Sequence, residues 1–457
     1  MLRRRFSEPL LLLLIFVFGV WLWDNHLGHP AGPPPDAWEL SLRKADRDLR
    51  IAEGTANLPD WMLLALGVDP LEQTLATTEA SFRQLAGKRL RLQEDPATRA
   101  LNDEGAYALA IVIALQQDAN AATGPFTTLG LPGPPPPEPI LSRIITGQEY
   151  WWDLAYLRGL NLPETEYAAK LVQARSQDLT NTAIKARGAV LALTLGGLVF
   201  VPGTLIAFMR AGRRKRRQRV NYSHRWHIGF GLGVFLLAYL AHVGFTITFN
   251  AALEHLAPIA TDGERKPLMS MPFFIALDSL TRFLPALIAL GFLFRRSRHA
   301  FTRLGMGGPL NIKLILGSFA ILQIIEFGLR MTLDRSGPPD PLGGLQASEE
   351  GYWGLLYSLA SACIAAPIAE EILYRGVLFR SLANRIRIWA AAIASSAVFA
   401  LVHFYELPSL IMVFSVGMTC ALCYASSRAL LTAIGLHALY NAAIKIPEWI
   451  VYHTPLS

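Results

Sequence analysis

The sequence predicts an all-α protein: a polytopic bundle of about nine transmembrane helices with an inserted extracytoplasmic helical domain. Of the 457 residues, 52% are hydrophobic and only 17% are charged, below the roughly 25% charged residues of soluble domains. Apolar runs long enough to cross a bilayer recur along the chain. A single long polar stretch, residues 24–186, contains no such run.

The first 23 residues predict a signal anchor. Residues 1–5 are basic, and residues 9–23 (PLLLLLIFVFGVWLW) are continuously apolar. A cleaved signal peptide is the alternative. The segment that follows, DNHLGHPAGPPPD, has no small-x-small cleavage site, which favours an uncleaved anchor with a cytoplasmic N-terminus.

Residues 24–186 predict a small all-helical domain. Prolines at 33–35 open it, and a Pro- and Gly-rich loop at 124–139 divides it. On both sides of this loop, apolar residues recur at three- and four-residue spacing, as in DEGAYALAIVIALQQDA.

Residues 187–457 predict the remaining membrane spans. The candidate spans are 188–209, 227–249, 271–294, 312–333, 352–382, 388–404, 410–425 and 430–450. Basic residues gather beside the apolar runs, at 3–5, 213–219 and 295–303. This is the positive-inside pattern of membrane proteins. The net charge of +7 therefore reflects basic clusters beside membrane spans, which predicts a multi-pass plasma or inner membrane protein rather than a nucleic-acid-binding protein. The pattern also places residues 24–186 outside the cytoplasm.

Two adjacent carboxylates, Glu370 and Glu371, lie inside the predicted span SLASACIAAPIAEEILYRGVLF. A charged residue at the centre of a bilayer costs roughly 2.5–3.5 kcal/mol on insertion scales, so it is rarely present without a role. Arg375 follows Glu371 by four residues, on the same helix face, and we expect it to neutralise Glu371. That leaves Glu370 for chemistry.

Three further polar residues fall at overlapping depths in the next spans. At about 1.5 Å per residue, Glu370 and His403 each lie about 20 Å from the cytoplasmic ends of their spans. His437 lies about 10–15 Å from that face, and Asn441 one turn deeper.

These groups suit hydrolysis. A carboxylate and an imidazole beside one water, here Glu370 and His403, can remove its proton. A second imidazole and a carboxamide, His437 and Asn441, can donate hydrogen bonds to a developing oxyanion. Zinc held by Glu370, His403 and His437 is the alternative, although there is no H-E-x-x-H core.

The residues resemble the motifs of the CPBP family (CAAX proteases and bacteriocin-processing enzymes), which includes the type II CAAX prenyl endopeptidases. E-E-x-x-x-R-G corresponds to 370–376, F-x-x-x-H to Phe399 and His403, and H-x-x-x-N to His437 and Asn441. The resemblance covers residues 352–446 and implies an intramembrane protease core in residues 187–457, open to the cytoplasm. It implies that Glu370 and His403 activate water, and that His437 and Asn441 form the oxyanion site.

The resemblance further implies a glutamate-dependent peptidase, although family members were long described as metalloproteases. We expect no cofactor, with zinc as the alternative. The expected partners are the lipid bilayer and a peptide or membrane-protein substrate, with a lipidated C-terminal tail as the family precedent. Two other classes remain open: a non-catalytic immunity or scaffold protein on the same fold, and a proton-coupled transporter. The transporter predicts internal repeats, and none is evident.

Overall fold

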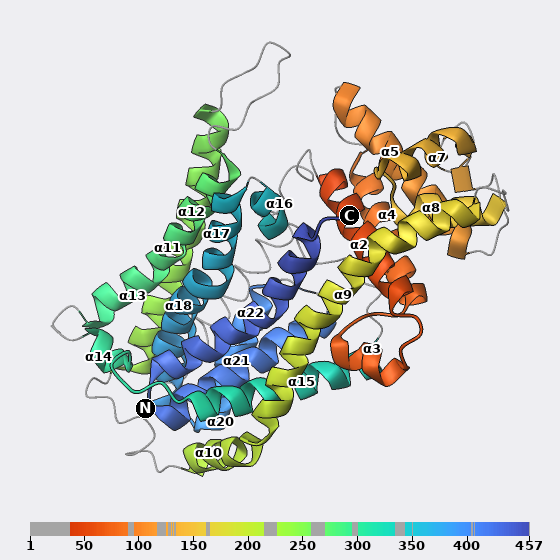
Figure 1. Ribbon diagram of the computed structural model, residues 1–457. Helices are drawn as coiled ribbons and strands as arrows, with labels where there is room; N and C mark the ends of the chain where they lie inside the picture. The colour runs from red at the N-terminus through yellow and green to blue at the C-terminus, as the bar shows by residue number, and fades with distance from the viewer. Residues whose placement is uncertain are drawn as a thin grey trace. The chain divides into compact units, whose positions relative to one another are not determined.

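The computed structural model describes residues 37–89, 96–116, 125–126, 129, 131, 134–160, 165–213, 226–256, 270–294, 300–333, 343–349, 351–403, 405 and 407–456. Within these residues the regular elements are all helices, which confirms the all-α prediction (Figure 1). The predicted signal anchor, residues 1–23, lies outside the described residues. The chain divides into two compact units. Unit 1 is Met1–Gly28, Ala192–Glu326 and Gln346–Lys445, and unit 2 is His29–Leu191, Phe327–Leu345 and Ile446–Ser457.

Unit 2 is built from short helices around an aromatic core. Its helices are α2 (Ala37–Gly54), α3 (Asp60–Leu66), α4 (Leu71–Arg89), α5 (Pro96–Gln116), α7 (Pro137–Thr146), α8 (Trp151–Leu160) and most of α9 (Thr165–Leu198). α2, α4, α5 and α8 pack against one another. Phe82 and Trp152 meet edge to face at 5.9 Å between ring centroids, and both are fully buried. This packing buries the apolar positions that recur every three to four residues.

Two helices of unit 2 end on glycines in the left-handed conformation. Gly67 (φ 67°) ends α3, and Gly147 (φ 76°) ends α7. At each end the glycine N–H donates to carbonyls of the last turn, which have no partner within the helix. The proline run of the predicted loop ends in Pro137, the first residue of α7, where a missing N–H costs nothing.

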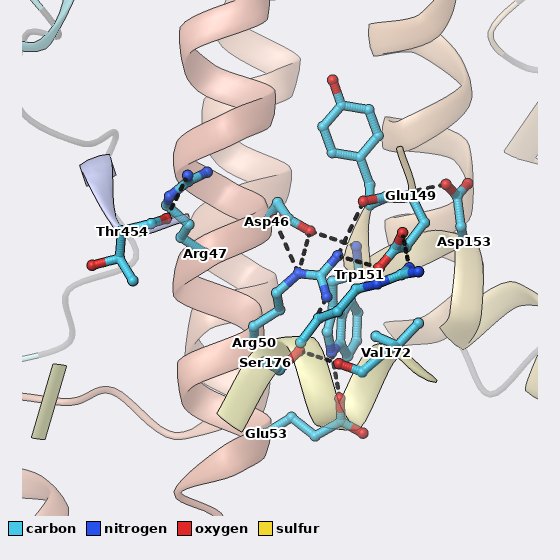
Figure 2. Close-up of polar contacts among 12 residues, drawn as sticks. Asp46, Arg47, Arg50, Glu53, Glu149, Trp151, Asp153, Val172, Ser176 and Thr454 are labelled. Carbon is cyan, nitrogen blue, oxygen red and sulfur yellow. Dashed lines mark hydrogen bonds and ion pairs between the residues drawn. The ribbon is translucent and has the colours of Figure 1, made fainter. Parts of the chain in front are cut away.

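A buried charged network ties α2 to the α7–α8 connection and to α9 (Figure 2). Arg50, which is 1% exposed, donates to both carboxylate oxygens of Asp46 at 2.9 and 3.0 Å. It also donates to the Glu149 carbonyl and to the Ser176 hydroxyl. The Trp151 N–H donates to Asp46 at 2.6 Å. Each buried charge therefore has partners, and these partners offset the free-energy cost of removing the charge from water.

Unit 1 carries the long apolar helices. These are α10 (Val201–Arg213), α11 (Ile228–Leu256), α12 (Met271–Thr281), α13 (Phe283–Phe294), α15 (Ile312–Thr332), α17 (Tyr352–Ala360), α20 (Ile388–Leu401), α21 (Leu407–Ser427) and α22 (Leu430–His453), with the short α14 (Ala300–Leu304) and α16 (Gly343–Glu349) between them. The last residues of α15 and α22 and the first residues of α16 belong to unit 2.

Within the described residues, five helical segments are long and apolar enough to cross a membrane, or six if a bent pair counts as one span. The protein is therefore an integral membrane protein by composition, whereas the predicted count of about nine stays a prediction. The expected span 188–209 is not one straight helix, because α9 and α10 meet at a 62° bend. The expected span 388–404 is the 14-residue α20, shorter than a bilayer crossing requires.

The segment that holds the two glutamates lies inside unit 1. It is one continuous helical stretch, Tyr352–Ala383, made of α17, η2 (Ser361–Ala365), α18 (Ala366–Glu370), η3 (Glu371–Phe379) and α19 (Arg380–Ala383). Its η3 portion packs against α11, α13, α20 and α21, so neighbouring helices surround it. Every residue of η3 is buried.

Both η segments are π-helical, which the sequence analysis did not predict. Pro367 lies at the start of α18 and has no N–H, so an α-helical hydrogen bond to the carbonyl of Cys363 cannot form. Cys363 belongs to η2. π turns widen the helix locally and are frequent at functional sites. Here they flank Glu370.

Candidate functional site

Three helical segments of unit 1 supply the residues that the sequence singled out. The motif helix carries Glu370, Glu371 and Arg375, and α22 carries His437 and Asn441. The third segment is α20 with the turn after it, which holds Phe399 and His403. The spacing of four within each motif places its members on one helix face.

Glu371 is the centre of the buried contacts. Its Oε1 lies 2.9 Å from Arg375 Nη1 and 2.9 Å from His437 Nδ1. Glu371 is 0% exposed, Arg375 1% and His437 5%. The expected pairing of Glu371 with Arg375 is therefore present. The contact with His437 was not expected, and it joins the first motif to the third.

Glu370 differs from its neighbour in exposure. Its side chain is 25% exposed, and its Oε2 lies 3.8 Å from His437 Nε2. The two nitrogens of the His437 ring thus face two different glutamates: Nδ1 faces the buried Glu371 and Nε2 faces the accessible Glu370. Because a carboxylate only accepts hydrogen bonds, the contact with Glu371 holds a proton on Nδ1.

His403 follows the last turn of α20. Its Nδ1 lies 2.7 Å from the Phe399 carbonyl oxygen. A carbonyl only accepts, so Nδ1 donates and the neutral ring keeps its lone pair on Nε2. Glu370, His437 and Arg375 all act electrostatically on His403. His403 therefore belongs to the same cluster and offers a proton-accepting nitrogen.

Phe399 is the apolar centre of the cluster. The Arg375 guanidinium carbon lies 4.4 Å from its ring centroid, within the range of a cation–π contact. The His403 and His437 rings meet it edge to face at 4.7 and 5.9 Å, and Tyr374 does so at 4.9 Å. The second motif thus supplies the surface that fixes the side chains of the other two, and Tyr374 is a member of this packing that sequence reasoning missed.

Asn441 is held by a backbone carbonyl of the motif helix. Its Nδ2 donates to the Ala362 carbonyl at 2.8 Å. Ala362 lies in η2, where the π turn alters the regular carbonyl pairing. One amide hydrogen of Asn441 is used in this contact, and a second remains. Ala362 has no polar side chain that could have marked this contact, and Pro367 is a sequence signal for the irregular helix.

The residues of the zinc alternative, Glu370, His403 and His437, all belong to this cluster. Among the described residues, no group of three or more His, Cys, Asp or Glu side chains is arranged to hold a metal ion. His437 Nδ1 contacts Glu371, and His403 Nδ1 contacts a backbone carbonyl. These contacts orient both rings and leave both Nε2 atoms available, so zinc stays the alternative.

Two comparisons place this region among known proteins. Residues 352–443 match the family model of the type II CAAX prenyl endopeptidase Rce1-like proteins. An 85-residue stretch is 31% identical to the Bacillus subtilis (strain 168) protein described as "Putative membrane peptidase YdiL". That stretch covers 19% of this chain and 34% of the relative, so the chain spans about a third of the length of the relative it matches. No solved structure is significantly similar to the chain.

The matched residues run from the start of α17 into α22. They contain all eight side chains of the cluster described above, from Glu370 to Asn441 and including Tyr374. Residues 352–443 of this integral membrane protein are therefore similar to the Rce1-like type II CAAX prenyl endopeptidases.

Proposed function

We propose that the protein is a glutamate-dependent intramembrane endopeptidase. The observation that carries this proposal is the different exposure of two adjacent glutamates. Glu371 is fully buried and occupied by Arg375 and His437, whereas Glu370 is 25% exposed and faces His437 at 3.8 Å. A carboxylate that must meet water has to be accessible, and one that orients other groups does not.

Glu370 and His403 activate the attacking water. The water lies between the Glu370 carboxylate and Nε2 of His403, and one of the two removes its proton as its oxygen bonds to the scissile carbonyl carbon. The carbonyl electron pair moves to oxygen. When the tetrahedral intermediate collapses, the C–N bond breaks and the proton passes to the leaving amine. The products are a carboxylate and an amine, and no covalent enzyme intermediate forms.

His437 and Asn441 stabilise the oxyanion. With Nδ1–H held by Glu371, a doubly protonated His437 ring donates from Nε2. That state also balances the local charge, since Glu370 and Glu371 carry two negative charges and Arg375 carries one positive charge. The second amide hydrogen of Asn441 is the other donor. In a low-dielectric site, one such donor is worth about 2.7–4 kcal/mol of the activation barrier.

The substrate we propose is a peptide or membrane protein that reaches the site within the bilayer, with a lipidated C-terminal tail as one form. We propose that the reaction needs no metal ion. The alternatives are the non-catalytic scaffold and the proton-coupled transporter. The scaffold predicts that a substrate binds but is not cleaved. The transporter predicts proton-dependent movement of a solute across the membrane.

A cleavage assay on the purified full chain tests the proposal. A library of membrane-anchored peptides is incubated with wild type, Glu370→Gln and His403→Ala, and the products are read by mass spectrometry. Each variant is expected to lose activity by at least about 100-fold, the contribution of general base catalysis. Glu326→Gln, in α15, is the matched control, because it changes a membrane glutamate outside the cluster.

Unchanged turnover in either site variant contradicts the mechanism. Binding without products in wild type supports the scaffold reading instead. Exhaustive chelation is expected to leave the wild-type cleavage rate unchanged. If chelation abolishes cleavage and added zinc restores it, the zinc mechanism is correct instead.

A further inference from the structure

Unit 2 contains a cavity of about 580 Å³, within the range of small-ligand pockets. α5 contributes Tyr107 and Ile111 to its wall, α8 contributes Trp152, and the segment 134–136 contributes three prolines. The Tyr156 hydroxyl donates to the Pro135 carbonyl at 3.1 Å, which fixes the proline wall. The cavity is therefore a rigid, mainly apolar and aromatic recess.

Three charged residues also line the cavity: Glu104, Arg143 and Asp153. Two of them form an ion pair. Asp153 Oδ1 accepts from Arg143 Nη2, and its Oδ2 accepts from the Tyr150 N–H at 3.0 Å. Glu104 is different, because among the described residues it makes no hydrogen bond or ion pair. Among the lining residues that the structure describes, there is thus one carboxylate more than the Arg143 guanidinium balances.

We propose that this cavity binds an organic cation: an ammonium or guanidinium group on an apolar stem. Its chemistry is that of a lysine or arginine side chain. The charged end pairs with Glu104, and the stem lies on the aromatic and proline wall. A half-buried tyrosine ring, Tyr107, adds an aromatic surface of the kind that attracts cations. An anion is disfavoured, because the described lining residues carry two carboxylates and one guanidinium.

The environment of Glu104 gives the binding a pH dependence. Burial raises the pKa of the Glu104 carboxyl, Arg143 opposes this shift, and Asp153 and Glu39 add to it. A cation binds the ionised carboxylate, so affinity is complete above the Glu104 pKa and falls as the pH drops through it. Because that pKa is raised, the loss begins at a higher pH than for an ordinary glutamate.

Calorimetric titration of the detergent-solubilised full chain tests the proposal. The probes are N-acetyl-lysine amide, n-butylamine as a free amine, and N-acetyl-norleucine amide as the neutral analogue of lysine. Both cations are expected to bind, and the neutral probe about ten-fold more weakly or not at all. Tighter binding of the acetylated amino acid than of butylamine identifies a peptide side chain as the source, and the reverse identifies a free amine.

Glu104→Gln is expected to weaken cation binding by roughly ten-fold while leaving the neutral probe unaffected. Glu138→Gln, an exposed glutamate on α7 outside the cavity wall, is the matched control and should bind like wild type. Equal affinity for the lysine and norleucine probes overturns the proposal, as does an unchanged affinity in Glu104→Gln. The assay measures binding without cleavage, so its outcome is independent of the proposed peptidase function.

Discussion

At the scale of single residues, the two adjacent glutamates of the first motif differ in their contacts. Glu371 pairs with Arg375 on its own helix and with His437 on α22, each at 2.9 Å. Its burial makes both contacts strong, because no water competes for the carboxylate. Glu371 is therefore a positioning residue, which holds the His437 ring so that Nε2 points toward the accessible Glu370.

Glu371→Gln tests this positioning role. The amide keeps the shape but loses the charge, so we expect kcat to fall by roughly 10- to 100-fold, as when a supporting carboxylate is removed. The variant also leaves Arg375 buried without its counter-charge, which is expected to cost about 3–5 kcal/mol of stability. Melting of the purified protein and initial rates measure the two effects.

The double variant Glu371→Gln with Arg375→Gln separates the two effects. Its melting temperature is expected to lie above that of Glu371→Gln alone, because no uncompensated charge remains. Its activity is expected to stay low, because His437 still lacks its carboxylate. Additive losses of stability would contradict the coupling between Glu371 and Arg375.

The buried Arg50 network of unit 2 makes a second prediction at this scale. Arg50→Met leaves Asp46 buried without its cation, while Glu149 keeps Arg175, and is expected to cost about 3–5 kcal/mol. Hydrogen exchange of the intact protein should then rise in peptides from α2 and α8. Lys170→Met is the control: it breaks a pair that is 71% and 81% exposed, worth about 0–1 kcal/mol. Similar exchange in both variants would contradict a stabilising role for burial.

At the scale of elements, helix approach decides where the site side chains lie. α20 and α21 pack closely, and Gly417 of α21 faces Ser396 of α20. A Cβ at Gly417 would lie 3.0 Å from Ser396 Cβ and 3.2 Å from Arg375 Nη2. The missing side chain thus lets α21 close over the buried guanidinium, which in turn lies on Phe399.

Gly417→Val is expected to displace Arg375 or to separate the two helices. Such overpacking costs about 1–3 kcal/mol, and we expect activity to fall together with the melting temperature. Gly291→Val in α13 is the matched control, since no atom lies within 4 Å of its added Cβ. An active, stable Gly417→Val protein would show that the α20–α21 contact does not hold the site.

At the scale of the whole molecule, the charge bias gives the orientation that we propose. We propose that the basic clusters at 3–5, 213–219 and 295–303 face the cytoplasm and that residues 24–186 lie on the other side of the membrane. Under this proposal the cavity beside Glu104 samples the extracytoplasmic space, while the peptidase site opens to the cytoplasm.

Cysteine labelling in intact cells measures this orientation. Glu138→Cys, exposed on α7, is expected to react with a membrane-impermeant maleimide added outside. Arg217→Cys, in the basic cluster, is expected to react only after the cells are opened. Labelling of wild type, which has three native cysteines, gives the background signal to subtract. The opposite labelling pattern would reverse the proposed topology.

Much of the site could be predicted because its motifs are local. Spacings of four residues put Glu371 with Arg375, and His437 with Asn441, on shared helix faces, and depth counting brought three spans together. The contact of Glu371 with His437 joins residues 66 positions apart and depends on how two helices rotate about their axes. No local pattern specifies that rotation.

The sequence by itself determined the helical class, the membrane character and the motif residues of the cluster, although not Tyr374, because hydropathy and helical period act along the chain. Only the tertiary structure decided that Glu371 is sealed and Glu370 accessible, since neighbours in sequence differ in burial only once other helices pack around them. It also decided that the expected span 188–209 bends by 62° and that π turns flank Glu370. Backbone hydrogen bonding and side-chain burial both depend on how helices pack against one another. A pattern of residues along the chain does not specify that packing.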